Sequence, residues 1–285
     1  FDFTTYRATL NFNQDETTLW YGSVARGGKT GGFNNTPIVS EQAFDSEFNT
    51  TFEVGYKASP SDTLTYSVAA YLTDWSDVQL TNPSSVPGNP NVTQNIGDVG
   101  SYGVEIDGTW LPTEQFSVSF GYAYSDPTFE DGTEDFTHAR RCTTAADCGL
   151  SEGPNGGIDI GGQTVDRISQ HQFYLSPQYE WGTDSWDFFV RGDIAYQSEQ
   201  FQRTLNLQTI EARTIVNGRI GMDNGKGLAL ALWVKNLTDE NYFASAINEP
   251  EFLFDLANFT LFQSTFTTGL LANGRQFGAS MTYSF

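Results

Sequence analysis

The side chains best suited to chemistry gather in one polar stretch, DPTFEDGTEDFTHARRCTTAADCG, residues 126–149. Arg140 and Arg141 are suited to hold an anionic ligand by paired hydrogen bonds, or to pair with the acids nearby. Cys142 and Cys148 are close enough in sequence to form a small disulfide loop in an oxidising compartment, with free thiols or half of a metal site as the alternatives. The stretch also holds hard oxygen donors that suit calcium, although they lack EF-hand spacing: Asp126, Glu130, Asp131, Glu134 and Asp135.

Catalysis finds little support in the rest of the chain. The sequence holds two histidines, His138 and His171. No Gly-x-Ser-x-Gly elbow and no His-x-x-x-His pair occurs, so neither a nucleophilic serine nor a histidine metal site can be assigned. We therefore expect no enzyme activity, no cofactor and no bound metal.

Charge excludes a further class of function. The net charge is -21 and the pI is near 4.2, so a basic face for nucleic acid is not expected. Such acidity favours solubility, or an exterior that holds divalent cations among its carboxylates. Only 38% of the chain is hydrophobic, yet 15% is aromatic, which suits a sheet with one apolar face and one wet face.

These side chains must be positioned by strands, because apolar and polar residues alternate along most of the chain. At the end of the chain, for example, Phe277, Met281 and Phe285 alternate with Gly278 and Ser284. The sequence therefore predicts an all-β protein with no helix in any ordered element. Eleven strands are expected at residues 4–12, 17–26, 48–58, 63–75, 97–110, 116–125, 167–180, 185–198, 211–222, 227–236 and 274–285.

The connections between these strands alternate without exception between short and long. Short turns fall at 13–16, 59–62, 111–115, 181–184 and 223–226, and long loops at 27–47, 76–96, 126–166, 199–210 and 237–273. In an antiparallel meander this order places every short turn at one end and every long loop at the other, as in outer-membrane barrels. The strands also reach the roughly 9–11 residues that a tilted membrane strand needs. A soluble two-layer sheet is the alternative, but it leaves the long loops unexplained.

A barrel assigns the two faces of each strand to different surroundings. The apolar side, with His171 near its outer rim, is expected to face lipid, and the polar side to line a wet lumen. Charged residues are permitted on the lumen side at Arg7, Glu53, Lys57, Glu105, Asp107, Arg191, Asp193 and Lys235. Whether these contact another part of the protein or only water is open at this point.

An odd number of strands indicates that more of the barrel lies upstream. Single-chain bacterial barrels have even strand counts, and eleven is half of 22, the size of plugged transporters. The opening FDFTTYRATL begins in mid-strand and lacks the pattern of a signal peptide. We expect residues 1–285 to be a single barrel portion, with a plug and the first half of the barrel encoded upstream.

Five stretches resemble one family, and they occur in the order expected for it. TTLWYGSVARGGKTGGFN, FEVGYKAS, GVEIDGTWLPTEQFSVSFGYAYSD, WVKNLTDENYFA and GRQFGASMTYSF occupy residues 17–34, 52–59, 103–126, 233–244 and 274–285. They resemble strand and loop segments of TonB-dependent outer-membrane receptors. The resemblance implies a 22-strand barrel with an amino-terminal plug, in the outer membrane of a Gram-negative bacterium.

That resemblance also implies a function and its partners. Such receptors import a scarce ligand, most often a ferric siderophore and otherwise haem, cobalamin or a glycan, with energy from the TonB complex acting on a segment before the plug. Lipid and lipopolysaccharide would surround the barrel, and a passive porin is the alternative. A basic mouth for the ligand is expected at Arg26, Lys29, Arg140, Arg141, Arg167, Arg203 and Arg275. Residues that could face the plug are Glu53, Lys57, Glu105, Asp107 and Arg191.

Overall fold

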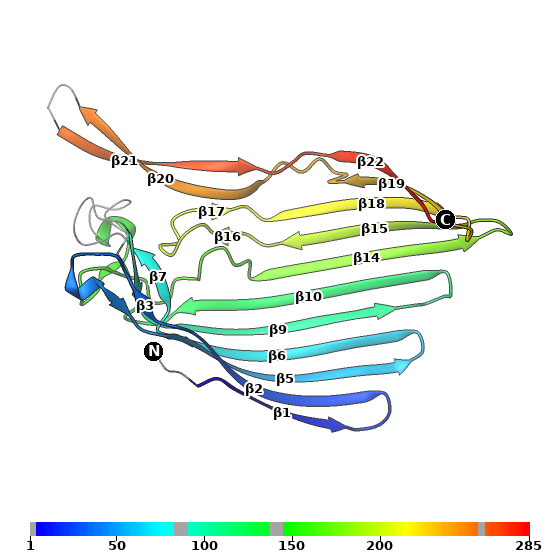
Figure 1. Cartoon of the computed structure of the whole chain (residues 1–285), viewed down its shortest axis with the longest axis horizontal. Coiled ribbons are helices and arrows are strands. Elements are labelled where there is room, and N and C mark those ends of the chain that lie inside the picture. Colours follow the sequence, from blue (N-terminus) through cyan, green and yellow to red (C-terminus); the bar gives the residue numbers. More distant parts are fainter. Residues whose placement is uncertain (1–3, 83–90, 137–144, 256–259) are drawn as a thin grey trace.

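The computed structural model describes residues 4–82, 91–136, 145–255 and 260–285. Eleven antiparallel strands form one sheet in which neighbours in space are neighbours along the chain (Figure 1). They are β1 (Tyr6–Asn13), β2 (Thr18–Lys29), β5 (Glu47–Ser61), β6 (Leu64–Ser76), β9 (Val99–Trp110), β10 (Phe116–Phe129), β14 (His171–Gly182), β15 (Asp187–Gln197), β18 (Arg213–Asp223), β19 (Leu228–Lys235) and β22 (Gln276–Tyr283). The prediction of an all-β protein with eleven strands is confirmed.

Some predicted boundaries were wrong. β10 runs on to Phe129 because it keeps pairing with β9 as far as Val99, beyond the predicted end at residue 125. β14 begins at His171 instead of residue 167. β5 ends at Ser61, inside the predicted turn 59–62, after an irregular register between Ala58 and Ser61.

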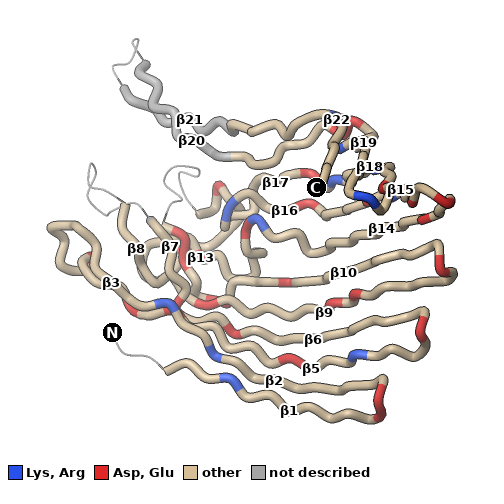
Figure 2. Tube along the Cα trace, turned by 45° about the vertical axis from the view of Figure 1, so that its right-hand side comes forward, with Lys and Arg blue, Asp and Glu red and all other residues tan. Residues whose placement is uncertain are grey.

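Short and long connections lie at opposite ends of the sheet, as predicted (Figure 1). Aspartate and asparagine side chains close the short turns by accepting backbone N–H groups, which is why these residues favour turns. Asp15 accepts the N–H of Thr17 at 2.8 Å, and this hydrogen bond lowers the pKa of the Asp15 carboxyl. Asp223 likewise accepts the N–H of Gly225 at 2.7 Å. Acidic residues mark most of these turns in Figure 2.

The register gives the sheet one apolar face and one polar face. On the apolar face the middle of the strands carries exposed aliphatic side chains: Leu10, Val54, Leu72, Ile220 and Leu232. Aromatic side chains flank this band at both ends. Toward the turns, Trp20 and Tyr56 have ring centroids 4.5 Å apart. Toward the loops, the centroids of Tyr124 and His171 are 5.1 Å apart, so His171 lies on the predicted face. An apolar band between two aromatic girdles is typical of a barrel exterior.

The polar face carries the predicted charged residues Glu53, Lys57, Glu105, Asp107 and Arg191, which share it by register. Large aromatic rings also lie flat on this face, and glycines make room for them. The ring of Tyr21 occupies the space that a Cβ at Gly55 would need, so Gly55 serves packing between strands.

Four of the long connections interlock into a structure that we call the loop cap. It contains β3 (Gly32–Phe33), η1 (Val39–Glu41), β4 (Ala43–Phe44), β7 (Gln79–Asn82), β8 (Val92–Asn95), β11 (Glu134–Asp135), η3 (Ala145–Cys148), β12 (Ser151–Glu152), β13 (Ile158–Asp159), β16 (Gln200–Phe201) and β17 (Thr209–Ile210). Three of these connections share one buried core of Val78, Ile96, Val99, Phe129, Ala145, Ile158, Ile160, Val165 and Leu205. The first connection joins them through hydrogen bonds, such as that from Asn34 Nδ2 to the carbonyl of Thr93 at 2.8 Å.

The prediction of a loop over residues 237–273 was wrong. The segment forms a long hairpin, β20 (Phe243–Asp255) and β21 (Thr260–Leu271), which projects beyond the sheet on the loop side (Figure 1). β20 pairs with β21 alone and joins no strand of the eleven-stranded sheet. In the described part of the chain, no helix has the length and apolar character to cross a membrane.

Candidate functional site

The polar face holds a hollow of about 530 Å³ below the loop cap, which we call the mouth recess. Two register rows build it. One row runs from Glu105 of β9 through Ala123, Gln172 and Gln197 to Arg213 of β18. The adjacent row contains Asp107, Gly121, Tyr174, Ala195 and Ile215. Five strands therefore bring acidic, amide, aromatic and basic side chains into one hollow.

Small residues explain why this part of the wall is hollow. Ala123 and Ala195 fill little space, and Gly121 has no side chain. The ring of Tyr174 lies where a Cβ at Gly121 would stand, so Tyr174 lies low across the wall. Tyr242, from the chain just before β20, closes one side of the mouth recess.

The charged groups of the mouth recess are held in different ways. Asp107 accepts a hydrogen bond from Ser67 Oγ at 2.7 Å. The guanidinium of Arg213 lies 5.1 Å from the ring centroid of Tyr242, a cation–π distance. Among the hydrogen bonds of the described residues, buried Arg213 Nη1 has no partner. Because a buried donor normally finds an acceptor, this nitrogen is available to donate a hydrogen bond to a further group.

Acids and bases are largely separated on the polar face, although Lys57 shares β5 with Glu53. Glu53, Glu105 and Asp107 lie on β5 and β9, whereas Arg213, Arg219 and Lys235 lie on β18 and β19. None of these six is in an ion pair with a described residue. Arg219 lies over Phe189 at 5.5 Å and Lys235 over Trp233 at 5.6 Å, so the cations rest on aromatic rings. Arg191 is different, because Asp193 binds it at 2.7 Å.

The residues predicted to form a basic mouth do not come together on one surface. Arg26 lies on the apolar face, where its guanidinium is 4.2 Å from the ring centroid of Phe48. Lys29 ends β2 and is exposed on the polar side of the register. Arg140 and Arg141 lie outside the described residues. The ligand role of all of them stays a prediction.

Arg167 and Arg203 lie in the loop cap beside Asp166. The distance from Arg167 Nε to Asp166 Oδ2 is 4.0 Å. Burial raises the pKa of the Asp166 carboxyl, although its own backbone N–H and the charges of Arg167 and Arg203 act in the opposite sense. Both arginines therefore already lie near a carboxylate of the loop cap.

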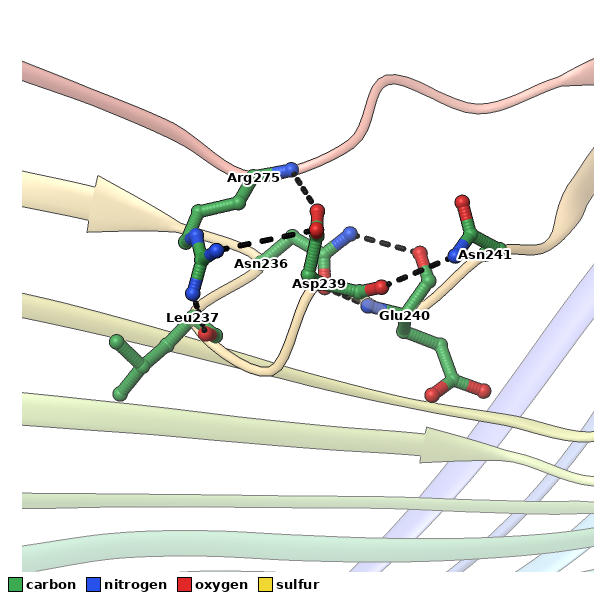
Figure 3. A network of polar contacts seen from close by, with 6 residues as sticks. All are labelled: Asn236, Leu237, Asp239, Glu240, Asn241 and Arg275. Atoms are coloured by element: carbon green, nitrogen blue, oxygen red, sulfur yellow. Dashed lines mark hydrogen bonds and ion pairs between the residues drawn. The ribbon is translucent and has the colours of Figure 1, made fainter.

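Arg275 belongs to a network at the end of β19, shown in Figure 3. Its backbone N–H donates to Asp239 Oδ1 at 2.7 Å, and its Nη1 donates to the carbonyl of Leu237 at 3.3 Å. Asn236 binds Glu240 in both directions, from Nδ2 to the carbonyl at 2.9 Å and from the N–H of Glu240 to Oδ1 at 2.8 Å. The Asn-Leu-Thr-Asp segment thus caps the exit from β19, as its turn-forming residues suggest.

Substitution of Asn236 is expected to loosen this exit. Asn236 has a backbone φ of 51°, a left-handed conformation that destabilises an alanine at this position by about 1–2 kcal/mol. Replacement by alanine or by glycine also removes side-chain hydrogen bonds worth about 1 kcal/mol. Asn236→Ala should therefore lower the free energy of unfolding by about 2 kcal/mol and Asn236→Gly by about half as much. Urea unfolding in lipid vesicles measures both, and equal losses would show that backbone strain plays no part.

The acidic residues of the loop cap serve its own structure. Glu134 is 1% exposed, and its carboxylate accepts the N–H of Asn155 at 3.0 Å and the N–H of Gly157 at 2.9 Å. Asp135 accepts the hydroxyl of Thr204. Within the described ranges, no group of three or more His, Cys, Asp or Glu is arranged to hold a metal ion. Cys148 is not a free thiol, but Cys142 lies outside the described residues, so the disulfide stays a prediction.

Sequence reasoning missed the mouth recess as a unit. Arg213, Gln172 and Gln197 stand at the loop ends of three strands, and the alternation places each of them on the polar side. Their union with Glu105 depends on the register of five strands, which the alternation does not fix across the long loops.

Comparison with known proteins identifies the family of this fold. The family model described as TonB dependent receptor-like, beta-barrel, matches residues 1–237. The ferric yersiniabactin uptake receptor FyuA from Yersinia pestis is similar over 98% of this chain and 37% of its own, with 16% identity and a TM-score of 0.74. BauA, the ferric preacinetobactin receptor from Acinetobacter baumannii, is similar over 99% and 36%, with 16% identity and a TM-score of 0.68.

A protein with a different cargo shares the same fold. The copper transporter OprC is similar over 99% of this chain and 39% of its own, with 13% identity and a TM-score of 0.65. The chain therefore spans little more than a third of each of these three structures. At such identities the likeness concerns the fold, which in all three is that of receptors or transporters rather than enzymes.

Proposed function

Because this chain belongs to the family of TonB-dependent receptor β-barrels, we propose that it is the carboxy-terminal half of a 22-strand receptor barrel in the outer membrane of a Gram-negative bacterium. Residues 1–285 would be a single barrel portion, completed by an upstream plug and eleven upstream strands. The apolar face would contact lipid and lipopolysaccharide, and the polar face would line the lumen.

One observation carries this proposal. The sheet of eleven strands is apolar between two aromatic girdles on one face, is polar on the other, and bears long packed loops at one end only. A soluble sheet would not leave Leu10 77% exposed beside Val54 at 64% and Leu72 at 62%, because contiguous apolar patches of this kind mark a lipid or protein contact.

The proposed activity is energised import of a scarce ligand, with a ferric siderophore foremost. Two of the similar structures are described as receptors for ferric yersiniabactin and ferric preacinetobactin, and a third, PiuA from Acinetobacter baumannii, as a siderophore receptor, which supports that choice. The copper transporter of the same fold keeps other cargo open, including haem, cobalamin and glycans. The TonB complex would act through the upstream region. Glu53, Lys57 and Arg191 would face the plug, with Glu105 and Asp107 at its upper margin.

Uptake of iron-55 tests this proposal. Cells that express the full-length gene are offered hydroxamate and catecholate siderophores loaded with iron-55, with and without a working TonB complex. We expect uptake of at least one complex, lost entirely when the TonB complex is removed. Uptake that persists without it would overturn energised import. Steady, large conductance of the full-length protein in planar bilayers would favour a passive porin instead.

A further inference from the structure

We propose that the mouth recess binds an extended amphoteric solute, with its cationic group at Glu105 and Asp107 and its anionic group at Arg213. This inference rests on the proposed function, since it names the class of ligand that an importer of this kind would admit. The proposal assigns the recess to a small solute rather than to a folded protein segment.

The mouth recess has charges of opposite sign at its two ends. Glu105 and Asp107 enter the mouth recess from β9, and Arg213 enters from β18. Neither end forms an ion pair with a described residue. A solute with one charge of each sign would supply both, and charge-assisted hydrogen bonds are the stronger kind.

The buried nitrogen of Arg213 indicates where the anionic group of the solute would bind. Arg213 Nη1 has no hydrogen-bond partner among the described residues, although the ring of Tyr242 covers the guanidinium. A carboxylate would accept from this nitrogen, and the planar guanidinium matches such an anion in two parallel hydrogen bonds. An acceptor here would remove the cost of an unmade hydrogen bond.

Neutral polar groups line the way between the two charged ends. Gln172 and Gln197 lie side by side in the same register row, with Gln197 Nε2 3.4 Å from Gln172 Oε1. Their remaining amide donors and acceptors can hold the polar backbone of a solute. Beneath them, Gly121, Ala123 and Ala195 leave the wall open. A contact surface of this kind suits a chain of amide or hydroxyl groups.

The distance between the charged ends sets the length of the solute. Glu105 and Arg213 are four strand spacings apart in one row, which is about 19 Å along the wall at roughly 4.8 Å per strand. Both side chains extend into the lumen and shorten this gap. The volume of about 530 Å³ lies within the range of small-molecule sites.

The position of the mouth recess favours a solute that arrives from the loop side. Gln172 lies second in β14, Gln197 ends β15, and Arg213 begins β18, each at the loop end of its strand. In Figure 1 these three strands stop short of the loop end that β9 and β10 reach. A solute would meet the mouth recess before it met a plug deeper in the barrel.

Glycine oligomers provide the probe. Pentaglycine carries an ammonium and a carboxylate at most about 17 Å apart when extended. Its affinity for the purified full-length receptor is compared by calorimetry with that of acetyl-pentaglycine, which lacks the cation, and pentaglycine amide, which lacks the anion. We expect pentaglycine to bind and each blocked peptide to bind at least tenfold more weakly.

Variants assign each end of the peptide. The double change Glu105→Gln with Asp107→Asn should remove the preference for the free amino group and keep the preference for the free carboxylate. Arg213→Gln should do the reverse. Arg219→Gln, an arginine of the same strand and face outside the mouth recess, is the matched control and should change neither. Circular dichroism checks that each variant keeps its sheet.

Two results would overturn the proposal: equal affinity for the three peptides, or no binding of any of them at millimolar concentration. Its failure is separable from that of the proposed function. Peptide preference without TonB-dependent uptake would retain the mouth recess and remove energised import. TonB-dependent uptake without peptide preference would do the opposite.

Discussion

Arginine in place of Val54 is expected to destabilise the protein in a bilayer by about 2–4 kcal/mol, the cost of a cation at the bilayer midplane of a barrel. Val54 is 64% exposed in the middle of β5, on the apolar face between the two aromatic girdles. No described carboxylate shares this face beside it, since its register partners are Gly22 and Ala70. The guanidinium would therefore have to remain in hydrocarbon or distort the lipid to reach water.

Glu53→Arg is the matched control, because Glu53 is the preceding residue on the polar face of the same strand. Its new cation would lie on the polar face of the sheet, in contact with water, so its cost should stay below about 1 kcal/mol. Urea unfolding of the full-length protein in vesicles measures both variants. If the two substitutions cost the same, the apolar face does not lie in lipid, and a soluble protein with a covered sheet would be the better interpretation.

The sheet could be predicted from the sequence because one property decides it. Apolar and polar residues must alternate along a strand that has lipid on one side and water on the other. The alternation of Phe52, Val54 and Tyr56 with Glu53 and Gly55 therefore shows which residues share the apolar face. The alternation of short and long connections then places the ends. The predicted strands agree with the structure to within a few residues, and the largest errors occur where β10 and β14 meet the loop cap.

The loops could not be predicted in the same way. Neither their core nor the hairpin β20–β21 follows from local pattern. Val78, Ile158 and Leu205 come from three connections and meet only through the folded sheet. The hairpin pairs only with itself, so the two faces of the large sheet impose no alternation on its sequence. The sequence of 237–273 therefore looked like an ordinary loop.

The candidate site shows a related limit. Arg26 was predicted to lie at the mouth because it is close to the long-loop end of its strand. Position along a strand does not determine which face of the sheet a side chain occupies. The register pairs Arg26 with Tyr6 and Thr50, and its guanidinium lies over Phe48 on the apolar face. Glu105 and Asp107 were placed by alternation, and the structure has them on the polar face. The alternation of apolar and polar residues predicted the face correctly, whereas position along the strand did not.

Alanine in place of Phe129 is expected to unfold the loop cap locally, at a cost of about 3–5 kcal/mol. Phe129 ends β10 and is 3% exposed, packed in the core that Ile158, Ile160 and Leu205 share. Removal of its ring leaves a cavity in the core that joins three of the connections, which hydrogen bonds such as that from the N–H of Thr164 to Asn206 Oδ1 at 2.7 Å also link. The sheet should be little affected, because its strands are paired by backbone hydrogen bonds and contact one another outside this core.

Limited proteolysis of the full-length protein in vesicles separates these two parts. We expect cleavage within 77–98, 130–170 and 198–212 to be faster by a hundredfold or more in Phe129→Ala, since each 1.4 kcal/mol of local opening is a factor of ten, while fragments that contain β1 to β6 remain protected. Phe33→Ala is the matched control, because that ring is 78% exposed in the first long connection and should change the rate little. Equal rates in the two variants would mean that the connections stand independently on the sheet. Faster cleavage in Phe129→Ala alone would mean that three loops, separated by long stretches of sequence, form one cooperative structure above the mouth recess.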